Sequence, residues 1–69
     1  MDKNKLLYFI KDRGYRVEDF LLIIGMKKNA FYRRINNECF SIKEIWYISD
    51  ILNLTLDDIN SIFFVKYVS

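Results

Sequence analysis

Glycine occurs only twice in this 69-residue sequence, and proline is absent. Folds built from many short strands depend on tight turns, in which these two residues are enriched, so their scarcity favours helices. Apolar residues make up 52% of the chain and aromatic residues 17%, which is typical of a chain that folds around a core. At this length we expect one all-α domain and no second one.

Glycines and capping residues indicate where the first helices begin and end. A first helix is expected to begin at Asp2 or Asn4, whose side chains can cap free backbone N–H groups, and to end at Gly14. A second is expected over 17–24 and ends at Gly25. Both glycines mark helix ends because glycine adopts the left-handed conformation without a steric penalty.

Polar residues indicate the later helices. The third, roughly 28–36, is mostly polar. Ser41 with Glu44 three residues later has the spacing of a capping box, which predicts that a fourth helix starts after Ser41. Thr55 is the cap expected for a fifth helix, with Asp58 at the third helical position.

Apolar residues recur at helical spacing in nearly every segment, and we expect them to form the core. These residues are Leu6, Ile10, Val17, Phe20, Leu21, Ile24, Met26, Phe31, Ile35, Ile45, Ile48, Leu52, Leu56 and Ile59. In the third helix, Phe31 and Ile35 are one turn apart, so they occupy one side and leave the other side polar.

Missing residue types exclude several functions. The chain has no histidine, the commonest general base and metal ligand, and no set of catalytic or metal-ligating residues, so we expect no enzyme, no metal and no cofactor. The single cysteine, Cys39, cannot form an internal disulfide. No apolar run reaches the roughly 18–20 residues of a membrane span, and the first residues lack an apolar signal core. We therefore expect a cytoplasmic protein without a membrane or small-molecule partner.

The net charge of +2 is unevenly distributed. Residues 1–43 carry ten Lys/Arg and five Asp/Glu, whereas residues 44–69 carry one lysine and four Asp/Glu. Four cations lie within 27–34, a span with no acidic residue. A focused basic patch fits a polyanionic partner. The alternative is an ordinary solvated helix face.

The second and third segments have the plan of a DNA-reading helix-turn-helix. One short helix braces across the DNA backbone, and a second, basic helix lies in the major groove. The strings over 14–26 (GYRVEDFLLIIGM), 31–36 (FYRRIN) and 50–55 (DILNLT) resemble Cro/repressor-type (XRE-like) regulators of bacteria and phages. The resemblance covers about residues 5–64 and is strongest with the small phage and prophage members.

This resemblance implies a lambda-repressor-like, five-helix DNA-binding domain over 1–69, with the motif at about 17–36. It also implies a bacterial cytoplasmic location and double-stranded operator DNA as the partner. Several positions depart from the family: it usually has a small residue where this chain has Leu21, and Ser or Thr where it has Arg16. Arg16 is a poor cap for the second helix.

Candidate base contacts lie at and after the start of the third helix, because the first residues of a recognition helix reach base edges. They are Lys27, Lys28, Asn29, Tyr32 and Arg33. Lys and Arg donate to guanine, and Asn pairs with adenine. Alternatives remain open for three of them: Asn29 as a helix cap, Tyr32 packed on the sugar-phosphate backbone, and Arg33 solvated or bound to phosphate.

Candidate phosphate contacts flank these positions. Arg34 and Asn36 lie nearer the end of the third helix, and Arg13 and Arg16 precede the second. Such contacts position a protein on the duplex without reading its sequence.

The β-branched and aromatic residues near the C-terminus predict a short extended or strand-like tail over 63–69. The apolar tail residues, too apolar to stay in water, are the expected contact of a homodimer: Phe63, Phe64, Val65, Tyr67 and Val68. Trp46, Tyr47 or the Leu22–Ile23 pair are further candidates for this contact. The alternative is that the tail folds back on its own chain and covers Leu22 and Ile23.

Together these features favour a sequence-specific DNA-binding transcriptional regulator, a phage or prophage repressor or Cro-like protein that acts by operator occupancy. Specific binding by one recognition helix usually requires a dimer. Two alternatives stay open: a protein-interaction module such as an antirepressor, and an excisionase-like architectural DNA-binding protein.

Overall fold

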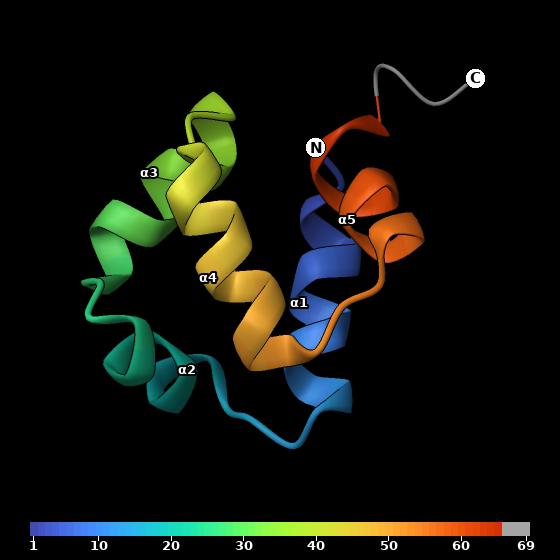
Figure 1. The fold of residues 1–69 in the computed structure, drawn as a ribbon. Helices are drawn as coiled ribbons and strands as arrows, with labels where there is room; N and C mark the ends of the chain where they lie inside the picture. The colour runs from blue at the N-terminus through green and yellow to red at the C-terminus, as the bar shows by residue number, and fades with distance from the viewer. Residues whose placement is uncertain (66–69) are drawn as a thin grey trace.

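The computed structural model describes residues 1–65, and within them the chain forms five α-helices and no strand. The helices are α1 (Lys3–Asp12), α2 (Val17–Ile24), α3 (Lys28–Asn37), α4 (Ile42–Leu52) and α5 (Leu56–Phe63). In Figure 1, α2 and α3 lie on one side of the molecule, α1 and α5 on the other, and α4 between them. The all-α prediction is confirmed.

Side-chain caps fix where three helices begin. Asp2 accepts a hydrogen bond from the first turn of α1. The Ser41 hydroxyl accepts from the Glu44 N–H at 3.1 Å, and the Ser41 N–H donates to the Glu44 carboxylate at 2.9 Å. Thr55 and Asp58 make the same reciprocal pair at the start of α5. These starts are confirmed, and each cap satisfies backbone donors that the helix itself leaves free.

Helix ends use the left-handed conformation more widely than the glycines indicate. Gly25 ends α2 with φ +69°, as expected. Glu38 after α3 and Asn53 after α4 adopt φ of +51° and +53°. Asn is a residue type that adopts this conformation at helix ends, whereas Glu38 turns the backbone with no such signal in the sequence.

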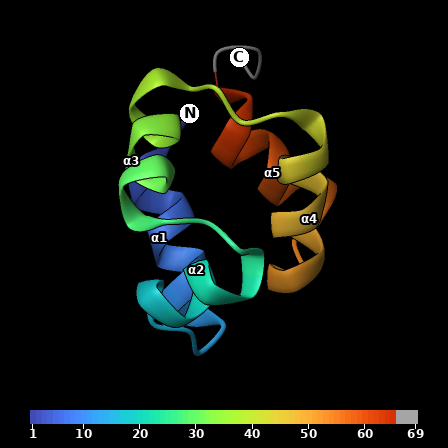
Figure 2. The ribbon, with the colours of Figure 1, turned by 90° about the vertical axis from the view of Figure 1, so that its left-hand side faces the viewer.

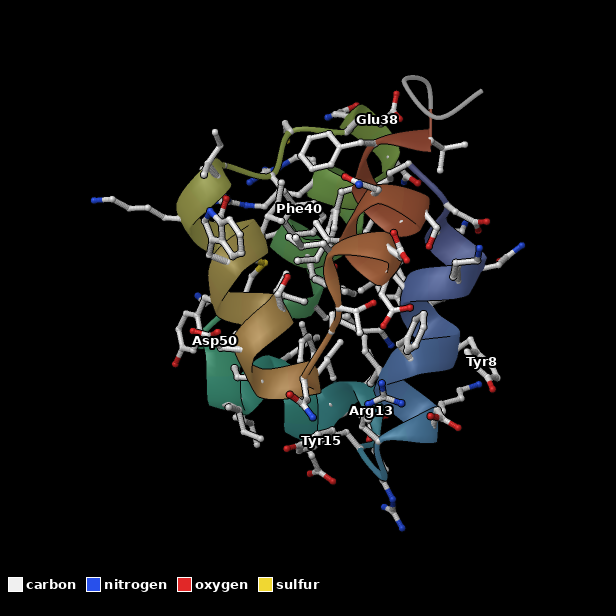
Figure 3. All side chains as sticks on the ribbon, turned by 45° about the vertical axis from the view of Figure 1, so that its right-hand side comes forward. Tyr8, Arg13, Tyr15, Glu38, Phe40 and Asp50 are labelled. Atoms are coloured by element: carbon white, nitrogen blue, oxygen red, sulfur yellow. The ribbon has the colours of Figure 1, made fainter. Side chains whose placement is uncertain are left out.

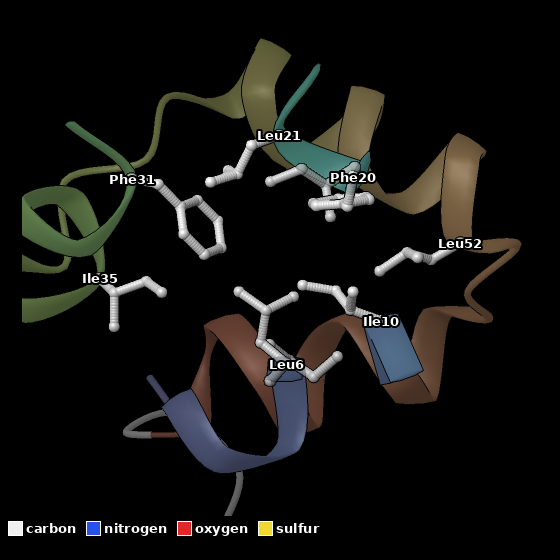
Figure 4. Packing of buried hydrophobic residues seen from close by; sticks show 9 residues of the cluster. Leu6, Ile10, Phe20, Leu21, Phe31, Ile35 and Leu52 are labelled. Atoms are coloured by element: carbon white, nitrogen blue, oxygen red, sulfur yellow. The ribbon is translucent and has the colours of Figure 1, made fainter. Parts of the chain in front are cut away.

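The core is built by side chains from all five helices that point toward one another (Figure 4). Phe20 of α2 and Phe31 of α3 are fully buried, with ring centroids 6.5 Å apart in an edge-to-face arrangement. Ten of the fourteen expected core residues are buried, and Val17, Ile24 and Met26 pack half-buried at its margin. Ile62 of α5 is also fully buried and was not expected.

The prediction that Leu56 belongs to the core is wrong, because its side chain is 69% exposed. Leu56 is the first residue of α5, whose buried residues are Ile59 and Ile62. At 100° per residue, Leu56 lies about a quarter turn away from the centre of that buried side. Its position in the first turn therefore directs it to solvent.

The expectation of a strand-like tail starting at Phe63 is also wrong. Phe63 is the last residue of α5, and its ring packs edge-to-face on Phe40 with centroids 5.9 Å apart. The Phe64 N–H donates to the Asn60 carbonyl at 3.1 Å and extends the helical pattern. Tertiary packing thus overrides the local preference of aromatic residues for extended backbone. Tyr67 and Val68 lie outside the described residues.

Candidate nucleic-acid interface

The α2–turn–α3 unit places two short helices around a turn of three residues, 25–27. Gly25 adopts the left-handed conformation, and the Met26 N–H donates to the Leu21 carbonyl at 3.0 Å, which closes the end of α2. Neither Arg16 nor Lys27, the residues that precede the two helices, makes a side-chain capping bond. The first N–H groups of both helices are therefore not capped by their own side chains. Figure 2 shows this unit on the side nearest the viewer.

The α3 helix has two chemically different sides. Phe31 and Ile35 are buried and hold the helix against the core, as expected. Asn29, Arg33 and Asn36 are exposed on the opposite side, while Lys27 just before the helix and Lys28 at its first position are exposed at its start. Residues 1–65 do not cover these side chains, so a basic surface faces solvent.

The four exposed base-contact candidates have no ion pair and no side-chain hydrogen bond within residues 1–65. This set is Lys27, Lys28, Asn29 and Arg33. Asn29 is the second residue of α3, and the cap position is Lys27. The alternative that Asn29 caps the helix is therefore wrong, which leaves its amide available to a ligand.

Tyr32 is half-buried and differs from the other four candidates. Its ring contacts Phe31 edge-to-face, with centroids 5.5 Å apart. It also lines an open hollow of about 570 Å³ between α2 and α3, together with Val17, Glu18, Leu21, Leu22, Met26, Lys27 and Lys28. The phenol is therefore a wall of this hollow, beside the two lysines, and its position is set by packing.

Arg34 pairs with Glu44 across the loop that joins α3 to α4. Burial of the Glu44 carboxyl favours its neutral form, but hydrogen bonds from Ser41 and the Arg34 guanidinium outweigh this effect, so the pKa of Glu44 is lowered. One N–H of Arg34 is thus used inside the protein, and this predicted phosphate contact also joins α3 to α4.

The remaining phosphate candidates fall into two groups. Arg13 donates through Nε to the Leu52 carbonyl at 2.8 Å, pairs with Asp12 and lies over the Phe9 ring at 5.1 Å. Its guanidinium therefore closes the end of α4, a contact that the sequence did not indicate. Arg16 and Asn36 are exposed, with no partner for their side chains among residues 1–65.

Several apolar side chains outside the core are exposed. Leu22 is 79% exposed, and Ile23 next to it is 45% exposed. Residues 63–65, the described part of the tail, therefore do not cover this pair. Instead, Phe63 and Phe64 line a small hollow with Phe40 and Ile45, while Val65 is exposed. Of the three tail residues that are described, Phe63 and Phe64 thus pack on their own chain.

In residues 1–65, no group of acidic residues and cysteine is placed to hold a metal ion, and no helix has the length and hydropathy to cross a membrane. Comparison of the chain with protein-family models, curated proteins and solved structures gave no match.

Proposed function

We propose that this chain is a sequence-specific DNA-binding transcriptional regulator of the Cro/repressor type, with a lambda-repressor-like fold. The observation that carries the proposal is the two-sided α3 helix. Its buried side is anchored by Phe31 and Ile35. Asn29 and Arg33 on the other side, and Lys28 at the start of the helix, are exposed without partners among residues 1–65. A rigid helix with free donors on one side is what reading base edges in the major groove requires.

The hydrogen-bonding groups of each exposed side chain determine which base it is proposed to contact. Lys28 and Arg33 donate to guanine O6 and N7, and Asn29 pairs with adenine N6 and N7. Lys27, at the turn, reaches a base edge or the adjoining phosphate. The packing of the Tyr32 ring against Phe31 places its phenol beside these side chains.

The phosphate contacts flank this reading side. Arg16 and Asn36 are free to bind phosphate oxygens. Arg13 and Arg34 keep N–H donors beyond those used with Leu52, Asp12 and Glu44, since a guanidinium has five. These four residues set the register of α3 in the groove.

The proposed mechanism is operator occupancy. A bound copy blocks access of RNA polymerase to the same DNA, in the cytoplasm of a bacterium. One recognition helix reads only a few base pairs, so two copies bind as a homodimer to two half-sites about one helical turn apart.

Selection of bound duplexes from a random DNA pool tests the proposal and identifies the operator. Binding to the selected duplex should weaken steeply as salt rises, because phosphate contacts release counterions. Arg33→Ala should cost about 1–3 kcal/mol and relax preference at one base position. Lys5→Ala, which removes an exposed cation from α1, is the matched control and should leave the base preference unchanged. A chain that binds no duplex at low salt would contradict the proposal.

A second candidate is a protein-interaction module of the antirepressor kind. The exposed Leu22 and the apolar lining of the hollow between α2 and α3 favour it. Leu22→Ser separates the two: it should abolish a protein contact made through the hollow, yet leave the salt-dependent affinity for selected DNA within about twofold. An excisionase-like architectural role predicts instead that bound DNA is strongly bent, which a circular-permutation mobility assay measures.

A further inference from the structure

We propose that the exposed side of α4 is the surface through which two copies of this chain pair, with their α4 helices antiparallel across a twofold axis. This surface, the α4 face, consists of Ile42, Lys43, Trp46, Tyr47 and Asp50, all of which are exposed. The inference goes beyond DNA binding and does not rest on it, because none of these residues is a proposed DNA contact.

Helix geometry places the five side chains together. At 100° per residue, they fall within an arc of about 140° on one side of α4. The opposite side holds Ile45, Ile48 and Leu52, which are buried in the protein. The α4 face is therefore a continuous strip along the helix, and its middle is aromatic.

The aromatic middle is what a helix pair needs at its centre. Trp46 is 53% exposed and Tyr47 is 50% exposed, and Ile42 one turn before Trp46 is 69% exposed. The Tyr47 hydroxyl donates to the Ile23 carbonyl at 3.3 Å, so the strip continues onto the exposed Ile23 of α2. Protein interfaces concentrate Trp and Tyr at the centre and place charged residues at the rim.

The charges on the α4 face select both the partner and its direction. Lys43 lies at the start of the helix and Asp50 in its last turn, about two turns apart, on either side of Trp46 and Tyr47. In an antiparallel pair, each Lys43 meets the Asp50 of the second copy. A parallel pair would set Lys43 against Lys43 and Asp50 against Asp50. The face is thus complementary to itself in only one of the two directions.

The helix alone does not explain these two charges. A cation in the first turn and an acid in the last turn both oppose the helix macrodipole. Within residues 1–65, neither Lys43 nor Asp50 forms an ion pair. Two charges that weaken their own helix and lack a partner in these residues are accounted for if each meets its opposite across the twofold axis.

The small area of the α4 face indicates how strongly two copies should associate. A standard interface buries about 800 Å² on each partner, whereas a helix of eleven residues is only about 16 Å long and presents one side. The pair should therefore be weak in solution, and the spacing of two half-sites on DNA would favour it by raising the effective concentration.

Sedimentation equilibrium without DNA, over about 10 µM to 1 mM chain, measures this pairing in the range expected for a weak contact. The mass should rise from the 8.4 kDa of one chain toward twice that value. Lys43→Glu and Asp50→Lys should each weaken association about tenfold, because both rim pairs become like-charged. The double variant carrying both changes restores opposite charges and should recover the association of the unmodified chain.

Controls separate pairing from folding and from DNA binding. Each charge change agrees with the helix macrodipole, so the midpoint of thermal unfolding should not fall in either single variant. Tyr8→Ala removes an exposed aromatic from α1, on the opposite side of the molecule from Asp50 (Figure 3), and should leave association unchanged. Affinity for a duplex with one half-site should also be unchanged in the α4 variants, so failure of the pairing is distinguishable from failure of DNA binding.

Three results would overturn the proposal. One is a mass that stays at that of a single chain throughout the concentration range. Another is a single charge reversal without effect, or a double variant that does not recover. The third is loss of association on removal of residues 66–69 while Trp46→Ala has no effect, which would assign the contact to the tail.

Discussion

Phe31 links the fold to the proposed function more directly than any other residue. Its ring is fully buried and makes edge-to-face contacts with Phe20, Tyr32 and Phe40, which come from α2, α3 and the loop before α4. The charged side of α3 is presented to solvent because this ring is held on the other side. The orientation of the proposed reading surface therefore depends on an apolar residue that is itself fully buried.

Replacement of Phe31 tests this dependence. Phe31→Ala removes a buried ring, and the lost burial and the cavity should lower the free energy of unfolding by about 3–5 kcal/mol. Urea denaturation followed by circular dichroism measures the loss. Leu22→Ala, at a 79% exposed position, should stay within about 0.5 kcal/mol. Equal losses in the two variants would mean that Phe31 does not anchor α3.

At the scale of the elements, the loop between α3 and α4 joins the proposed reading helix to the rest of the protein. Glu44 both completes the capping box with Ser41 and pairs with Arg34. Its carboxylate is the charged form in each contact. The start of α4 and the end of α3 are thus stabilised by one ionised group.

The lowered pKa of Glu44 predicts how stability depends on pH. A carboxyl whose pKa is lower in the folded state contributes stability above its unfolded pKa and loses it as pH falls through the folded value. Unfolding should therefore become easier on acidification below the usual glutamate range. Glu44→Gln should cost about 1 kcal/mol at neutral pH and make this acid dependence shallower, as thermal melts between pH 7 and pH 3 would show. An unchanged pH profile in the variant would assign the dependence to other carboxylates.

The sequence could predict those elements whose stabilising contacts lie close together along the chain. The starts of α4 and α5 follow from Ser41 and Thr55, because a cap acts within four residues. The helical state of Phe63 depends on Phe40, more than twenty residues away, so local preference was misleading there. The left-handed Glu38 carries no such local signal, whereas Asn53 is of a residue type that adopts this conformation at helix ends.

The same distinction applies to the candidate site. The free side of α3 could be predicted, since the one-turn spacing of Phe31 and Ile35 determines it within a single helix. The partners of Arg13 and Arg34 could not, because Leu52 and Glu44 meet them only when the chain folds. For the same reason the sequence did not distinguish arginines free to bind phosphate from those already engaged.

On the scale of the whole molecule, folding separates the charges that the sequence already distributes unevenly. The exposed cations Arg16, Lys27, Lys28 and Arg33 lie in or just before α2 and α3, where Glu18 and Asp19 are the exposed acidic residues. The first turn of α5 carries Asp57 and Asp58. Figure 1 places α5 on the side of the molecule away from α2 and α3. A protein with a net charge of only +2 thus presents a basic surface at α3 and acidic residues at the start of α5, a distribution that fits the proposed DNA partner.

Arg16 tests this electrostatic arrangement, because its charge is exposed and has no partner among residues 1–65. If it binds one phosphate, Arg16→Ala should weaken binding about equally for all duplexes and reduce the slope of log affinity against log salt by about one. Fluorescence anisotropy titrations between low and moderate salt give that slope. Arg33→Ala, proposed to read a base, should instead change which duplex is preferred and affect the slope less. A change of preference in the Arg16 variant with an unchanged slope would reverse the two assignments and place the start of α2, not the middle of α3, against the bases.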